Sequence, residues 1–292
     1  MTKVLKKQVH RTIYEKTIPF YLKNLFPLLI LSLLFFSCDN STESEYNEDY
    51  IYPISLGNTW IYEGTFSTEM YETSNSSNDL SLNIKDTIVV DSFYSEVDNI
   101  FRFKTVRSEE FQDETPSNFI GYQYISNGSN GLLHHGYESP GGSLTLPRSI
   151  STKKKYKIND VLFTHEELIN FFLNRFSDIT WEEEPLVSIK YPFKINDQWV
   201  YRRETLHNDP WRMDRVVIEK NNDEFKIQTL YDLDHDLSWD DNIKVFHTYS
   251  YEKGLIKYSL TVDSTQIMDE NGNSSGHGKS QTNLDLIKYQ TD

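Results

Sequence analysis

Tyr52-Pro-Ile-Ser-Leu-Gly-Asn-Thr-Trp60-Ile-Tyr62 decides the fold of this 292-residue chain, because the pattern recurs as Tyr191-Pro-Phe-Lys-Ile-Asn-Asp-Gln-Trp199-Val-Tyr201. Tyr, Pro, Trp and Tyr stand at identical spacing in both stretches. The residues after each Trp mix aromatic and β-branched side chains, which are typical of strands. The Gly-Asn and Asn-Asp pairs stand where a tight turn would precede each strand. We therefore expect each stretch to form a turn followed by a strand.

Three further pairs of similar segments follow in the same order along the chain. They are residues 86–91 with 214–219, 101–106 with 225–230, and 131–133 with 254–256. Self-similarity of this kind indicates repeated supersecondary units. We therefore predict a mainly β protein made of two tandem copies of a curved antiparallel β-sheet unit, half-barrel or sandwich-like. The first unit is expected over residues 51–160 and the second over residues 191–292.

One short helix is expected between the two units. Thr164-His-Glu-Glu167 matches a capping box, the pattern that begins a helix. Apolar residues follow it at helical spacing, namely Leu168, Phe171, Phe172 and Phe176. We therefore predict a helical connector over residues 161–190, with its apolar stripe filling the join between the units.

The N-terminus reads as an export signal. Residues 1–23 carry six basic side chains against one acid, and an apolar run of 12 residues follows over 25–36. A membrane helix needs roughly 20 apolar residues, so this run predicts the core of a signal peptide over residues 1–37. The run ends in Ser37-Cys38, which contains the only cysteine of the chain.

Cys38 is the predicted site of lipid attachment. The residues directly after it, through Tyr50, carry five acids and no base. We therefore interpret residues 38–50 as an acylated cysteine followed by an acidic disordered tether. The alternative is a buried structural cysteine after a secretory leader.

The signal and the repeated motif together resemble Bacteroidota-type lipoproteins, which carry a Tyr-Pro-Leu-x-x-Gly-Asn-x-Trp-x-Tyr motif soon after their tether. Phe35 and Phe36 depart from the strictest form of the family's lipobox. The resemblance implies an outer-membrane location, lipid-anchored, on the periplasmic face or at the cell surface. It also implies that the membrane is a partner through the acyl anchor on Cys38. It transfers no catalytic residue, because most such proteins have no assigned activity.

Charge and composition exclude several classes of protein. The chain has 44 acidic and 29 basic residues, a formal net charge of -15, which repels a phosphate backbone and argues against nucleic acid as a partner. A lone cysteine makes no internal disulfide and no cysteine-rich zinc site. No phosphate-binding or dinucleotide fingerprint is present in the sequence, so no cofactor is expected.

Two sequence patterns suggest metal ligands but fall short of a metal site. Asp232-Leu-Asp-His-Asp236 has the alternating acids of a calcium loop, yet Leu237 stands where an EF-hand requires glycine, and Ile243 replaces its terminal Glu. This excludes an EF-hand and leaves a weak surface calcium site against an ordinary solvated loop. His134-His135 is expected to be a pair of surface histidines, and we predict no metal site.

Three functions remain open after the sequence analysis. The first is a non-enzymatic binding or accessory role toward a glycan, a peptide or a partner protein of an envelope complex. The second is a half-barrel carrier of a lipid or other apolar ligand, and the third is a hydrolase with an acidic dyad. No catalytic residue is identified, and an enzyme is the less favoured reading. Trp60 and Trp199 are expected to be core anchors rather than sugar-stacking platforms.

The lipid anchor leads to a direct prediction. Cys38→Ser removes the acylated sulfur, and because stable anchoring requires two or more acyl chains, the protein should move from the membrane to the soluble fraction. Cell fractionation followed by immunoblotting measures this, with unchanged unfolding as the control for an intact fold. Membrane association of the variant that persists in high salt would contradict the acyl anchor.

Overall fold

The computed structural model describes residues 50–72, 79–111, 115–138, 155–164, 167–168, 180–206 and 209–291. Cys38, the predicted signal peptide, the predicted tether up to residue 49 and most of the predicted helix lie outside these described residues. Within the described ranges, no helix has the length and the apolar character needed to cross a membrane.

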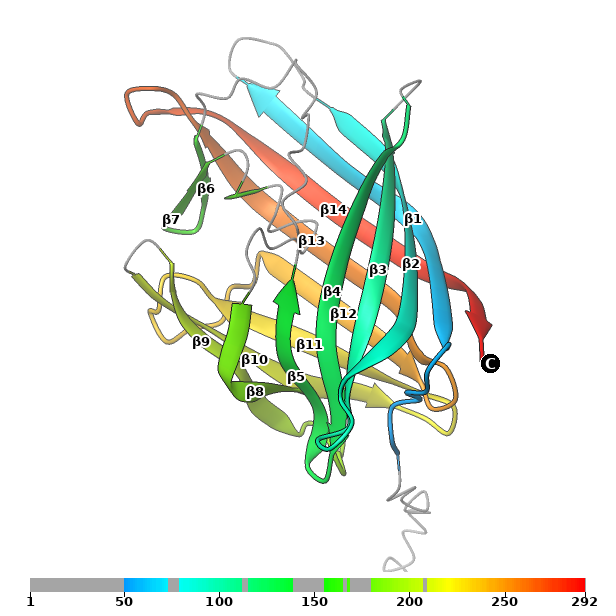
Figure 1. Ribbon diagram of the computed structural model, residues 1–292. Coiled ribbons are helices and arrows are strands. Elements are labelled where there is room, and N and C mark those ends of the chain that lie inside the picture. Colours follow the sequence, from blue (N-terminus) through cyan, green and yellow to red (C-terminus); the bar gives the residue numbers. More distant parts are fainter. Residues whose placement is uncertain are drawn as a thin grey trace, which may run out of the picture. The chain divides into compact units, whose positions relative to one another are not determined.

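The chain forms strands that pair antiparallel throughout (Figure 1). In chain order they are β1 (Thr59–Glu72), β2 (Leu80–Ser95), β3 (Ile100–Phe111), β4 (Ser117–Gly128), β5 (Gly131–Glu138), β6 (Lys155–Ile158), β7 (Val161–Thr164), β8 (Thr180–Lys190), β9 (Gln198–Leu206), β10 (Asp209–Lys220), β11 (Glu224–Asp232), β12 (Ile243–Ser250), β13 (Gly254–Met268) and β14 (Ser274–Gln290). The prediction of a mainly antiparallel β protein is confirmed.

All of these strands belong to one sheet. Its order is β8-β5-β4-β3-β2-β1-β14-β13-β12-β11-β10-β9, and the β6–β7 hairpin pairs with β13. β1 and the C-terminal strand β14 lie side by side along most of their length (Figure 1). The sheet is therefore continuous across the boundary that the sequence predicted between two units.

One face of the sheet is buried from strand to strand. In β1 the buried side chains recur at every second residue, as expected for a strand with one face in a core. Register carries this face across the sheet, so that Tyr62 of β1 lies opposite Asp86 of β2, which lies opposite Arg107 of β3. We call this the inward face.

Side chains join the two edge strands, β8 and β9. The Trp199 indole N–H donates to the Val187 carbonyl at 2.8 Å, and Arg202 pairs with Glu182 at 2.5 Å. No backbone ladder between β8 and β9 is present among the described residues. The sheet is therefore nearly closed and barrel-like, with a seam of side-chain contacts in place of the last ladder. This protects edges that would otherwise offer unpaired backbone groups.

The repeated motif contributes to an aromatic core. The Tyr52 N–H donates to the Tyr191 hydroxyl at 3.0 Å, so the equivalent tyrosines of the two stretches bind each other. Trp60 is 1% exposed, stacks on Phe103, and donates its indole N–H to the Lys253 carbonyl at 2.6 Å. The interpretation of Trp60 as a core anchor is confirmed.

The predicted connector over residues 161–190 is narrower than expected, because strands occupy both of its ends. β7 and β8 form there, and in β7 Val161 and Phe163 are buried while the residues after them are exposed, the alternation of a strand. The capping box does form: the Thr164 N–H donates to a Glu167 carboxylate oxygen at 2.7 Å, and the Glu167 N–H donates to the Thr164 hydroxyl at 3.2 Å. Of the described residues between these strands, 167–168 are helical.

Candidate functional site

Arg215 is the central residue of the candidate site, on the inward face of β10. It is 7% exposed, and the residues two positions before and after it, Met213 and Val217, are buried as well. Its neighbour on the adjacent strand β11 is Thr229. Its Nη1 donates to the Ser188 carbonyl of β8 at 2.5 Å. Its guanidinium lies 3.8 Å from the centre of the Tyr201 ring. Arg215 therefore lies beside the seam, held by a carbonyl and by a cation–π contact.

His134 of β5 is a buried neutral histidine near Arg215. It is 9% exposed, and neither ring nitrogen has a hydrogen-bond partner among the described residues. Burial, reinforced by the charges of Arg202 and Arg215, lowers its pKa to about 3. The ring is therefore neutral at neutral pH and offers one donor and one acceptor. The sequence predicted a surface histidine here, which is wrong because the His134 side chain is buried within the sheet structure, where β5 is paired on both sides with β4 and β8.

His247 of β12 repeats this arrangement on the other side of Arg215. Burial, together with the charge of Arg215, lowers its pKa well below the usual range. Its Nδ1 lacks a hydrogen-bond partner in the part of the chain that the structure describes, and so does the hydroxyl of Thr229 on the neighbouring strand. An unsatisfied buried polar group costs about 1–3 kcal/mol, so these atoms call for a ligand or water.

Tyrosine hydroxyl groups add donors to the inward face. Burial raises the pKa of Tyr258 to about 12, so its hydroxyl stays protonated at neutral pH, and the Tyr258 ring lies 5.1 Å from the His247 ring. Burial raises the pKa of Tyr231 as well. The groups around Arg215 are therefore neutral hydrogen-bonding groups.

The inward face also holds a complete ion pair. Arg107 of β3 donates from Nε and Nη2 to the two carboxylate oxygens of Asp86 on β2, at 2.7 and 2.6 Å. Asp86 is buried, and the side chain of Arg107 is mostly buried. The charge of this pair is balanced internally, which differs from the situation of Arg215.

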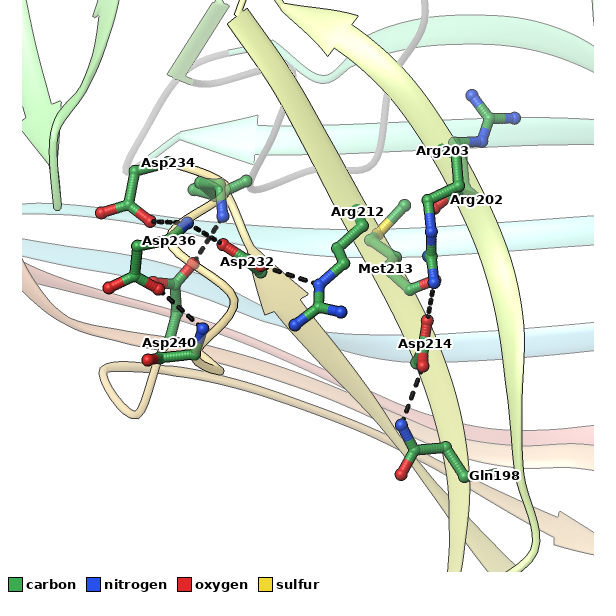
Figure 2. Close-up of polar contacts among 12 residues, drawn as sticks. Gln198, Arg202, Arg203, Arg212, Met213, Asp214, Asp232, Asp234, Asp236 and Asp240 are labelled. Carbon is green, nitrogen blue, oxygen red and sulfur yellow. Dashed lines mark hydrogen bonds and ion pairs between the residues drawn. The ribbon is translucent and has the colours of Figure 1, made fainter.

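The acidic loop predicted as a weak calcium candidate brings its carboxylates together (Figure 2). Oxygens of Asp232, Asp234 and Asp236 lie within 4.8 Å of one another. Asp232 is fully buried, however, and accepts hydrogen bonds from Arg212 Nε at 2.7 Å and from the Asp236 N–H at 3.1 Å. Leu237 adopts a φ of 73°, the left-handed conformation that an EF-hand assigns to glycine. These contacts give the carboxylates a role in holding the loop.

Burial raises the pKa of Asp240, at the end of this loop, to about 6. Asp240 accepts hydrogen bonds from the Leu233 N–H and from the Asn159 amide, so it ties the loop to the β6–β7 hairpin. The ordinary reading of the segment as a polar loop accounts for all of these contacts.

Three buried acids each pair with an arginine rather than with another carboxyl. Asp86 pairs with Arg107. Asp232 pairs with Arg212, and Asp214 pairs with Arg203, both at 2.7 Å (Figure 2). Asp214 also accepts a hydrogen bond from Gln198 at 2.8 Å. An acidic dyad requires two carboxyl groups that face each other, whereas each of these three carboxylates faces a guanidinium. The hydrolase hypothesis gains no support from this geometry.

A cluster of aromatic side chains lies on the opposite, outward face. The Tyr94 and Trp181 rings lie 4.8 Å apart, each contacts Tyr124, and Trp181 is 45% exposed. The sequence analysis instead assigned the sugar-stacking alternative to Trp60 and Trp199. Trp60 is buried and Trp199 lies at the seam, so neither ring offers an open stacking surface.

Sequence reasoning missed the residues of the candidate site. The sequence did contain a signal for them, because residues two apart in a strand lie on the same face. Arg215 lies midway between two apolar residues that face inward, and His134 lies two residues after buried Leu132. Cys38, the predicted lipidation site, lies outside the described residues.

Comparison with known proteins does not assign the chain to a family. No protein-family profile matches the sequence, and no curated protein sequence matches it. One similar solved structure is a domain from Vibrio parahaemolyticus, provisionally described as an outer membrane lipoprotein-sorting protein. The two share 10% sequence identity over 79% of this chain and 85% of that chain, with a TM-score of 0.18. A TM-score of this size is too low to establish a common fold or function.

Proposed function

We propose that this protein is a non-enzymatic binding protein of the cell envelope, anchored through an acylated Cys38, which holds a small ligand against the inward face of its sheet. The observation that carries the proposal is the set of buried polar atoms without hydrogen-bond partners among the described residues. Among them are ring nitrogens of His134 and His247 and the hydroxyl of Thr229. Native proteins satisfy such atoms almost everywhere, so a bound molecule is the simplest account of them.

The same observation separates this proposal from the alternatives. A carrier of a purely apolar ligand would be favoured by an apolar inward face, whereas this face contains an arginine and two histidines. A glycan or a partner protein would engage exposed groups such as Trp181. Outward binding of that kind leaves the buried ring nitrogens of His134 unsatisfied, which makes it the weaker account.

We further infer that the sheet is a duplicated meander. In its order, β1 to β5 followed by β8 form one run, and β9 to β14 form the other. Gly131 and Gly254 stand at equivalent places in the two runs, and both have positive φ. Trp60 and Trp199 are likewise equivalent, and each donates its indole N–H to a main-chain carbonyl. Duplication would place the candidate site at the junction where the last strand of one copy meets the first strand of the other.

The proposal predicts that the native protein contains a ligand. The full chain is purified from its own membranes under mild conditions and examined by native mass spectrometry. We expect a complex heavier than the acylated polypeptide by one small molecule, which denaturation releases. A mass equal to that of the acylated polypeptide alone would refute the proposal.

Thr229→Val is the matched variant for this experiment, since it replaces the inward hydroxyl with a methyl group of similar size. We expect it to lower the fraction of ligand-bound protein while the unfolding free energy of the ligand-free protein stays the same or rises, because a buried unpaired hydroxyl is removed. Thr248→Val, at the neighbouring position to His247 and therefore on the outward side of β12, is the control and should retain the ligand.

A further inference from the structure

Arg215 differs from the other arginines of the described chain, because it has no carboxylate as an ion-pair partner there. Five arginines form ion pairs in the described part of the chain: Arg102, Arg107, Arg202, Arg203 and Arg212. Arg215 forms none with any described residue, although it is as deeply buried as Arg202. A buried charge is strongly destabilising unless an opposite charge compensates for it. The structure therefore contains a buried cation that forms no ion pair with the described residues.

The groups around Arg215 do not supply an opposite charge. Its two contacts are the Ser188 carbonyl and the Tyr201 ring, which are neutral. The pKa values of His134 and His247 are lowered, so neither imidazole adds a charge at neutral pH. The nearby Arg202 is already compensated by Glu182. None of these groups therefore forms an ion pair with Arg215.

The free edge of the Arg215 guanidinium has the geometry for an anion. Nη1 donates to Ser188, but Nε has no hydrogen-bond partner among the described residues, and Nη2 forms no hydrogen bond with any of them. Nε and Nη2 form the edge that binds planar anions through two parallel hydrogen bonds. Two other arginines of this protein use that edge for a carboxylate: Arg107 with Asp86, and Arg102 with Asp91. In Arg215 the same edge is available.

We propose that the free guanidinium edge of Arg215 binds the anionic group, a carboxylate or a phosphate, of the ligand held on the inward face. This assignment rests on the function proposed above and defines the chemical class of its ligand. Neutral His134, His247 and Thr229 add hydrogen bonds to the same ligand, which places uncharged donors and acceptors around the charged end. Burial of the site strengthens the interaction, because the electrostatic attraction is less screened than in water.

Three short amphiphiles test the assignment: octanoate, octyl phosphate and octanol. The full chain carrying Cys38→Ser lacks the acylation site and is studied without detergent, by isothermal titration calorimetry. We expect octanoate or octyl phosphate to bind more tightly than octanol, and the tighter of the two anions identifies the group. In Arg215→Gln we expect anion affinity to fall by about 10- to 100-fold with octanol affinity unchanged, the effect of losing a charge-assisted bond.

Two further variants keep the result interpretable. Arg215→Lys keeps the charge but loses the two-nitrogen edge, so anion affinity should be intermediate. Arg102→Gln removes an exposed, paired arginine away from the inward face and should bind all three compounds like the parent chain. Imidazole NMR signals of His134 and His247 should shift on addition of the anion, which a purely structural Arg215 would not cause.

The outcomes separate the two proposals. If octanol binds while neither anion binds more tightly, or if Arg215→Gln and Arg215→Lys bind anions like the parent chain, the anion assignment is overturned and inward ligand binding stands. If none of the three compounds binds and the native protein also lacks a ligand, both proposals are overturned.

Discussion

Trp60→Ala is expected to lower the free energy of unfolding by about 3 to 5 kcal/mol, the range for large-to-small substitutions in a core. The Trp60 side chain is 1% exposed and contacts the rings of Tyr52, Phe103 and Tyr289. Its indole N–H also binds the Lys253 carbonyl, so truncation leaves that acceptor without its donor as well as creating a cavity. Denaturant unfolding followed by tryptophan fluorescence and circular dichroism measures the loss.

Trp181→Ala is the matched control, because it makes the same chemical change at an outward-facing site that is 45% exposed. We expect a loss of less than about 1 kcal/mol, since nearly half of the side chain is already in water in the folded state. Equal losses in the two variants would contradict the assignment of Trp60 to the core.

The fold class could be predicted because it depends on local patterns. The aromatic and β-branched residues after Trp60 and Trp199 indicate strands, whichever neighbouring strands they pair with. Closure of the sheet could not be predicted, because it depends on tertiary contacts that have no local signal in the sequence. These contacts are Trp199 with Val187, Arg202 with Glu182, and Arg215 with Ser188. The continuous pairing of β1 with β14 likewise joins the two ends of the described chain and has no local signal.

The candidate site was harder to predict than the fold. The alternation in Gly131-Leu-Leu-His134 places His134 on the same side as Leu132. Burial of the His134 side chain also depends on the pairing of β5 with β8, which has no local signal in the sequence. β-bulges add a second difficulty, since one between Met213 and Asp214 in the β9–β10 ladder shifts which residues of β9 face inward. The acidic segment 232–236 shows the reverse case, in which a conspicuous sequence pattern becomes a loop whose carboxylates bind the protein itself.

Asp86→Ala is expected to cost about 3 to 5 kcal/mol of unfolding free energy at neutral pH, because it removes the carboxylate that compensates the buried charge of Arg107. Asp91→Ala is the matched control. It breaks an ion pair of the same two-nitrogen geometry, Asp91 with Arg102, whose hydrogen bonds are 2.9 Å long but whose side chains are 22% and 38% exposed. An exposed pair contributes about 0–1 kcal/mol, so the two Asp→Ala variants should differ by at least about 2 kcal/mol.

A double variant distinguishes the cost of an uncompensated charge from the loss of a favourable contact. Asp86→Leu combined with Arg107→Leu removes both charges and leaves apolar side chains on the inward face. We expect it to be more stable than Asp86→Ala alone, because no unbalanced charge remains buried. Additive losses in the double variant would instead mean that the pair stabilises the sheet through its hydrogen bonds.

Arg215 gives the complementary case within the same sheet. Arg215→Gln removes a charge that has no carboxylate partner among the described residues, so without ligand the variant should be no less stable than the parent chain. Asp86→Ala leaves the buried charge of Arg107 without its carboxylate and should destabilise the protein, whereas Arg215→Gln removes a buried charge that has none and should not. The difference between the two arginines would then follow from the presence or absence of an internal carboxylate.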